Sequence, residues 1–71
     1  MIEQRFGRVI REQRAQKGWS QERLAEAAHL NRSYLGEIER GEVAASLVTV
    51  AKLAEALRLS LSVLFSHCER D

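Results

Sequence analysis

Four polar side chains within residues 32–40 could together form hydrogen bonds to a nucleic acid. They are Arg32, Ser33, Glu37 and Arg40. Their spacings of one, four and three residues would place them on one side of a helix, with no large aliphatic residue among them. A face with donors, an acceptor and two positive charges is either simply solvated, or it reads base edges in the DNA major groove, which is wide enough to admit a helix.

The elements that would position this face are two short helices joined by a tight turn. We expect the first over residues 21–28, with Ser20 as its N-terminal cap. The second should cover residues 32–40, capped by Asn31 and ended by Gly41. Only three residues connect them, which forces a steep crossing angle and predicts a helix-turn-helix.

At this point the sequence resembles the phage repressor and Cro-type (XRE-like) family of DNA-binding proteins. The run over residues 20–41 carries the resemblance most strongly, and matches before and after it extend over nearly the whole chain. The matching segments are Phe6-Gly7, Ile10-Arg11, Arg14, Ser20-Gln21-Glu22, Leu24-Ala25, Leu30-Asn31, Arg32-Ser33-Tyr34-Leu35, Ile38-Glu39-Arg40-Gly41, Ser46-Leu47 and Leu61-Ser62-Val63-Leu64-Phe65. Among family members, the chain most resembles the small controller proteins of restriction–modification systems.

The resemblance implies an all-α, five-helix lambda-repressor-like domain and roles for particular residues. Arg14 should form a structural ion pair with Glu39, tying the first helix to the end of the recognition helix. Gln21 and Arg40 match positions that contact DNA phosphates. The turn position of His29 is usually glycine in the family, and histidine tolerates the positive φ expected there better than most residues. Glu42 and Ala45 stand where the family often has basic residues and proline.

The outer face of the second helix suggests how bases would be read. Arg32 suits a bidentate contact to guanine, and Glu37 suits the cytosine amine, with Ser33 reading a neighbouring base. Tyr34 should contact the DNA backbone or the centre of the site. Gly36 either allows close approach of its backbone to DNA or is merely tolerated in the helix.

The length of 71 residues predicts one domain over residues 1–71. The first helix should cover residues 2–17, with Phe6, Val9 and Ile10 facing the core. Ser46 should cap a fourth helix over residues 47–57. Its expected inward stripe is Leu47, Val50, Ala51, Ala54 and Leu57.

Residues 57–66 allow two interpretations. Their large apolar residues alternate with period two, which favours a strand, and such a strand could pair with its copy in a dimer. The preferred alternative is a turn followed by a short fifth helix from about residue 61 to 66, capped by Ser60, with residues 67–71 as a frayed tail. The dimer interface is expected here, with Leu61, Leu64 and Phe65 as its contacts, because so small a core cannot hide every apolar residue.

Composition limits the functions and locations that the chain could have. The net charge is only +1, so binding should depend on specific contacts more than on a broad positive field. A single cysteine fits a reducing, cytoplasmic location, and we expect no leader and no membrane span. No catalytic pair, phosphate loop or metal cluster is recognisable, so no enzyme activity, cofactor, metal or small-molecule ligand is expected.

These observations predict a sequence-specific transcriptional regulator that binds double-stranded DNA as a homodimer. Two recognition helices, one turn of DNA apart, would read a pseudo-palindromic operator. The alternative is an antitoxin-like protein-interaction module that binds DNA only secondarily and uses its apolar C-terminal end for another protein.

Overall fold

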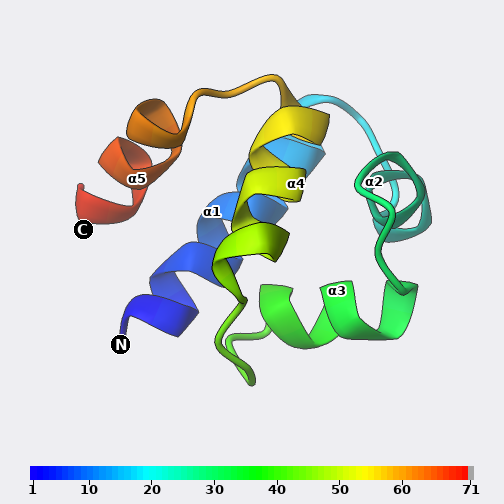
Figure 1. Ribbon diagram of the computed structural model, residues 1–71, viewed down its shortest axis with the longest axis horizontal. Coiled ribbons are helices and arrows are strands. Elements are labelled where there is room, and N and C mark those ends of the chain that lie inside the picture. Colours follow the sequence, from blue (N-terminus) through cyan, green and yellow to red (C-terminus); the bar gives the residue numbers. More distant parts are fainter. Residues whose placement is uncertain (71) are drawn as a thin grey trace.

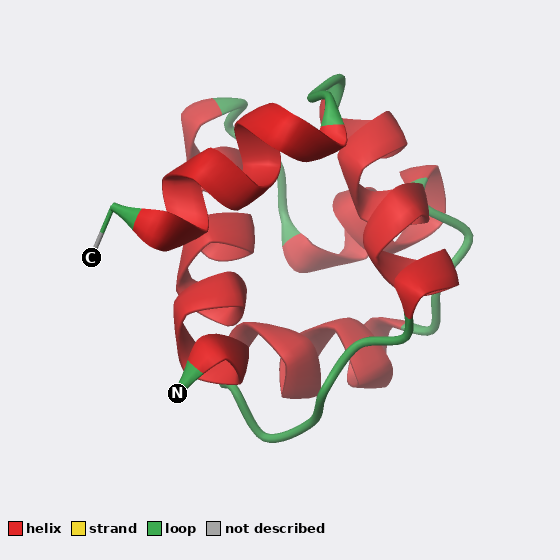
Figure 2. Ribbon diagram, turned by 60° about the vertical axis from the view of Figure 1, so that its left-hand side comes forward, coloured by secondary structure: helices red, strands yellow, loops and turns green. Residues whose placement is uncertain are grey.

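The computed structural model describes residues 1–70, and its described part contains five helices and no strand (Figures 1 and 2). This confirms the predicted all-α, five-helix architecture. In Figure 1, α3 lies at the lower right, below α2, and runs across the view, whereas α1 and α4 run obliquely up it. The helices are α1 (Ile2–Gln16), α2 (Gln21–Ala27), α3 (Arg32–Glu39), α4 (Leu47–Leu57) and α5 (Leu61–Glu69).

Side-chain caps define the starts of four helices. Asn31 Oδ1 accepts from the backbone N–H groups of Ser33 and Tyr34, at 2.8 and 3.3 Å. Ser20 and Ser60 each accept from the N–H three residues later, at 3.1 Å. Ser46 caps α4 in the same way. Each cap satisfies backbone donors that the first turn of a helix leaves free, and so fixes where the helix begins.

Two non-glycine residues with positive φ direct the chain out of helices. His29 has φ 56°, as the family resemblance implied for the turn between α2 and α3. Arg58 has φ 59° and ends α4, which was not anticipated. Arg58 and the Ser60 cap turn the chain from α4 into α5. The alternating apolar residues of 57–66 therefore do not form one extended segment. The strand interpretation is therefore wrong, and the helical one is confirmed.

One apolar core lies between the helices, with Ile10, Leu24 and Leu53 fully buried. The predicted stripe of α4 needs correction. Leu47 is 76% exposed and Ala51 is exposed, whereas Leu53 lies in the core. The stripe actually follows the i, i+3, i+4, i+7 pattern typical of a core-facing helix. Its members are Val50, Leu53, Ala54 and Leu57.

The C-terminal helix is longer and more deeply packed than expected. It continues to Glu69, so residues 67–69 are helical instead of frayed, and residue 71 lies outside the described part. Leu64 is 0% exposed and Cys68, one turn later, is also buried. The assignment of Leu64 to a dimer interface is therefore wrong, because its side chain completes the core. Burial raises the pKa of the Cys68 thiol.

No helix within residues 1–70 combines the length and the apolar character needed to cross a bilayer.

We expect Leu64→Ala to lower the free energy of unfolding by about 2–5 kcal/mol, because it removes core methyl groups and leaves a cavity. Leu61→Ala is the matched control on the same helix, where the side chain is 43% exposed and the loss should be much smaller. Urea titrations at equal protein concentration measure both values. Equal losses would contradict the packing described here.

Candidate nucleic-acid interface

The α2-turn-α3 unit places α3 at the edge of the molecule with one side uncovered. The turn is closed by the N–H of Leu30, which donates to the carbonyl oxygen of Ala25 at 2.8 Å. Leu35 and Ile38 point inward from α3 and are fully buried. The opposite side of α3 is left facing solvent.

That outer side collects the four polar residues singled out in the sequence. Arg32, Ser33 and Arg40 are exposed, and Glu37 is partly buried. With Gln21 from α2 and Gly36, they line a shallow hollow of about 220 Å³. Tyr34 does not line the hollow, since its partly buried ring packs against the core. The hollow therefore joins charged and hydrogen-bonding groups from both motif helices.

The Glu39 carboxylate, whose side chain is 2% exposed, holds three helices together. Oε2 accepts from Arg14 Nε at 2.8 Å, and Oε1 accepts from Arg14 Nη2 and from Gln21 Nε2, both at 2.9 Å. Arg14 also donates through Nη1 to the carbonyl oxygen of Trp19, at 2.9 Å. The ion pair implied by the family resemblance is thus present, and the link to Gln21 adds α2 to it.

The electrostatics of this pair favour the charged form of Arg14. Its hydrogen bonds to Glu39 outweigh the opposing effect of burial and raise the pKa of the guanidinium. A buried charge is tolerated only when its hydrogen-bonding capacity is met, and here both carboxylate oxygens are occupied. The network therefore fixes the end of α3 relative to α1 and α2.

Close contact between α1 and α3 depends on Gly7. A Cβ atom at this position would lie 2.8 Å from the carbonyl oxygen of Glu39 and would also meet that of Ile38. Only glycine lets the two backbones approach this closely. The sequence analysis assigned no structural role to Gly7. The one feature that pointed to it was the match of Phe6-Gly7 to the family motif.

Two further features surround the motif. Trp19 packs partly against the core, and the Lys17 and Arg23 side chains lie over its ring, 5.3 and 4.9 Å from the centroid. Arg40 and Glu42 form an exposed ion pair on the α3 side, which the sequence did not reveal. Within residues 1–70, no group of three or more His, Cys, Asp or Glu side chains could hold a metal ion.

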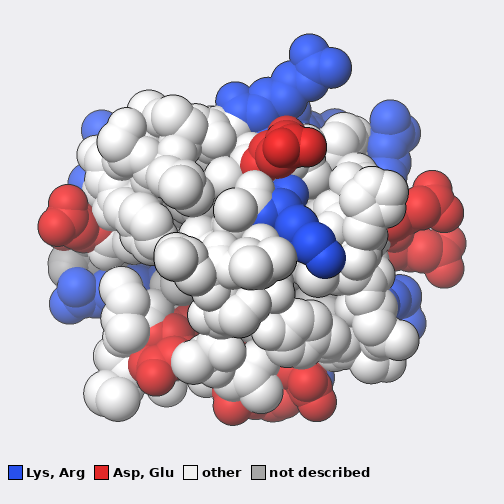
Figure 3. Space-filling model, in the orientation of Figure 1, with Lys and Arg blue, Asp and Glu red and all other residues white. Residues whose placement is uncertain are grey.

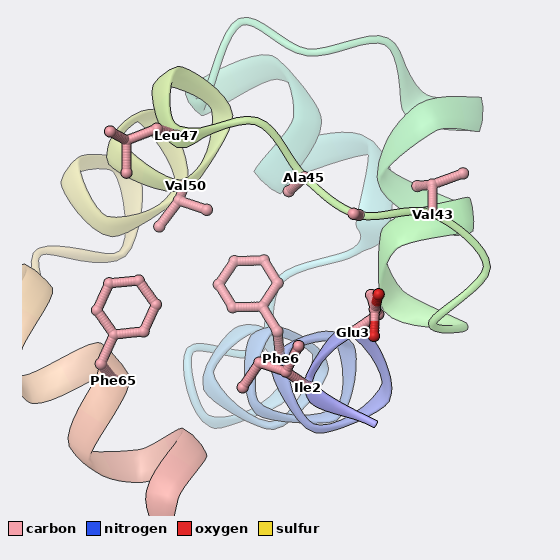
Figure 4. A pocket seen from close by; sticks show the side chains of 9 residues that line it. Ile2, Glu3, Phe6, Val43, Ala45, Leu47, Val50 and Phe65 are labelled. Carbon is pink, nitrogen blue, oxygen red and sulfur yellow. The ribbon is translucent and has the colours of Figure 1, made fainter.

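A separate apolar groove of about 380 Å³ lies between the start of α1, the loop before α4, and α5 (Figure 4). In Figure 4 the ring of Phe6 lies between Phe65 on one side and Val43 and Ala45 on the other, with Leu47 and Val50 above the two rings. Phe65 and Leu61 are 39% and 43% exposed, so these two predicted interface residues remain accessible at the surface. Figure 3 shows that this face is uncharged over most of α5, whereas an acidic and a basic side chain lie near its centre, over α4.

Comparison with known proteins shows which family this chain belongs to. The sequence matches the helix-turn-helix family model over residues 10–64, which include all of α2, α3 and α4. The chain belongs to the helix-turn-helix family. The matched region also contains both members of the Arg14–Glu39 pair.

Several members of the helix-turn-helix family are similar to this chain. Control protein C.MunI from a Mycoplasma species is 38% identical over 71 residues, which cover 99% of this chain and 96% of C.MunI. The Escherichia coli transcriptional regulator SutR is 39% identical over 58 residues, but the chain spans only 33% of its length. The chain therefore matches nearly the whole of C.MunI but only part of SutR.

Solved structures of restriction-modification controller proteins are also similar to this chain over most of its length. The restriction-modification controller protein C.AhdI from Aeromonas hydrophila is 48% identical, with a TM-score of 0.85 that covers 89% of this chain and 96% of that chain. The controller protein C.Esp1396I, as a tetramer in complex with its natural 35-base-pair operator, has a TM-score of 0.89 at 28% identity, covering 96% and 90%.

We expect Glu39→Gln to lower the free energy of unfolding by about 3–5 kcal/mol, because it leaves the Arg14 cation buried without its counter-charge. Glu42→Gln is the matched control, since it removes the same charge from an exposed pair and should leave stability nearly unchanged. Thermal and urea unfolding measure both. Similar stabilities for the two variants would contradict the structural role of Glu39.

Proposed function

We propose that this chain is a sequence-specific DNA-binding transcriptional regulator that acts as a homodimer on a pseudo-palindromic operator. The observation that carries the proposal is the exposed outer face of α3, whose orientation is fixed by the buried Glu39 network. Family membership and full-length similarity to control proteins support it.

In this proposal the start of α3 reads bases. Arg32 and Ser33 are exposed in the first turn of α3, the end of a recognition helix that contacts base edges. Arg32 donates both N–H groups of its guanidinium edge to guanine O6 and N7, while Glu37 accepts from a cytosine amine. Tyr34 contacts either the DNA backbone or the centre of the site.

Gln21 and Arg40 hold the register through phosphates. One hydrogen of Gln21 Nε2 is used by Glu39, and the other remains available to donate to a phosphate oxygen. Arg40 lies on the rim of the same hollow. Contacts of this kind position a protein on DNA without carrying sequence information.

Dimerisation uses the apolar groove and its border. One short helix reads only a few base pairs, so a second copy is needed to recognise a full operator. Ile2, Leu47 and Phe65 are exposed apolar side chains that line the groove, and Leu61 on α5 is a further exposed apolar residue. The tetramer of the similar C.Esp1396I on its operator supports self-association of this chain on DNA.

The proposed activity is binding and requires no catalysis and no cofactor. The family is one of DNA-binding regulators, and control proteins of similar length share nearly the whole chain. The proposed location is the cytoplasm, where the protein would reach its DNA. Its domain is the whole of residues 1–71, with the motif near residues 20–41.

Selection of the duplexes that the protein binds from a random DNA pool identifies the operator. Titrations with this operator and with a scrambled duplex measure how strongly the protein prefers the operator. We expect Arg32→Ala to weaken operator binding by about 10- to 100-fold and to relax preference at one guanine, because it removes a bidentate base contact. Lys52→Ala removes one exposed positive charge from α4 and serves as control. No enriched duplex for the wild-type protein would overturn the proposed function.

Phe65→Glu should convert a dimer into a monomer, because it places a charge in the apolar groove. The control, Ser66→Glu, adds the same charge to an exposed position of α5 away from buried Leu64. Sedimentation equilibrium measures the association. A dimer equally stable in both variants would show that the groove is not the interface.

A further inference from the structure

The guanidinium of Arg40 is already bound to an anion of its own chain. Nε donates to Glu42 Oε2 at 2.9 Å, and Nη2 donates to Oε1 at 3.3 Å. Each hydrogen bond has the expected effect on its partner: the pKa of Arg40 is raised and that of Glu42 is lowered. The carboxylate therefore occupies one complete edge of the guanidinium, in the two-bond geometry that a phosphate also adopts with arginine.

The pair lies on the surface that the proposed function assigns to DNA. Arg40 lines the outer hollow of α3 together with Arg32 and Gln21. Its Nη1 sits over Gly36, since a Cβ atom there would be only 3.0 Å away. Both members of the pair are more than half exposed, so phosphate oxygens and salt ions can compete for Arg40.

The acid of the pair lies directly beside the helix that is proposed to bind DNA. Glu42 follows directly after the helix that carries the reading face, and the chain as a whole has a net charge of only +1. Electrostatic attraction to phosphates supplies most of the sequence-independent affinity for DNA. A carboxylate that neutralises one of the few cations on this face should reduce that term.

We propose that Glu42 is an internal counterion of Arg40 that competes with DNA phosphate and thereby lowers the affinity of the protein for DNA. This inference rests on the proposed function of the α3 face. A phosphate that binds the Nε–Nη2 edge of Arg40 must displace the carboxylate, so this contact contributes less than that of a free arginine. Glu42 acts through Arg40, and it raises the protein concentration at which an operator becomes occupied.

The competition predicts a change in salt dependence as well as in affinity. In the wild type, Arg40 releases little additional counterion from DNA, because its own charge is already balanced. Glu42→Gln should steepen the plot of log affinity against log salt by about 0.9, the value for one more neutralised phosphate. It should also tighten binding by about threefold at low salt, on operator and scrambled DNA alike, since phosphates carry no sequence information.

The test is a set of titrations of five proteins on both duplexes at several salt concentrations. The proteins are the wild type, Glu42→Gln, Arg40→Gln, the Arg40→Gln/Glu42→Gln double variant and Glu12→Gln. Glu12 is an exposed acid on α1. It lies on the side of α1 opposite Gly7 and Arg14, which face α3. Its substitution therefore measures the general effect of removing one negative charge.

We expect Glu42→Gln to tighten binding and steepen the salt dependence only when Arg40 is present, and Glu12→Gln to have little effect. Two results would overturn the inference. Weaker binding by Glu42→Gln would show that the carboxylate orients Arg40 for DNA. Equal tightening in the Arg40→Gln background would show simple repulsion between Glu42 and phosphates.

The inference and the proposed function fail in different ways. A wild-type protein with no preference for any duplex would overturn the operator-binding function. The salt slopes on scrambled DNA would still report on the Arg40–Glu42 pair. Circular dichroism confirms that each variant is folded.

Discussion

The buried carboxylate of Glu39 is the interaction on which the rest of the structure depends. It receives hydrogen bonds from α1 through Arg14 and from α2 through Gln21, while it belongs itself to the last turn of α3. A carboxylate that is almost completely removed from water is strongly destabilising unless such partners are present. The three helices are therefore held in one arrangement, and the outer face of α3 takes its orientation from it.

The two ion pairs of α3 illustrate opposite uses of the same chemistry. The Arg14–Glu39 pair is buried and has no competitor, so it serves structure. The Arg40–Glu42 pair is exposed at the edge of the hollow, where phosphates could replace the carboxylate. Burial alone separates the two roles, because solvent and DNA can reach only the second pair.

Much of the fold could be predicted because its signals are local. Ser20, Asn31 and Ser60 cap helices where the sequence placed them. The positive φ of His29 was implied by the family resemblance. The shared outer side of Arg32, Ser33, Glu37 and Arg40 was predicted as well, since helical spacing alone brings these residues together. The Arg14–Glu39 pair is separated by 25 residues, and only family resemblance indicated it.

Other features depend on tertiary packing and could not be predicted locally. Leu64 and Leu61 are both leucines near the start of α5, and only the position of α5 against the core decides which of them is buried. Gly7 matters because α3 crosses directly over it. The role of Glu42 depends on how the chain turns after Gly41, which has φ 73°.

The most direct test of the account is a crystal structure of the protein with its selected operator. It should show α3 in the major groove, with the Arg32 guanidinium about 3 Å from guanine O6 and N7. The Arg14–Glu39–Gln21 bonds should be unchanged from the free protein. DNA lying along another surface, with the outer face of α3 in solvent, would contradict it.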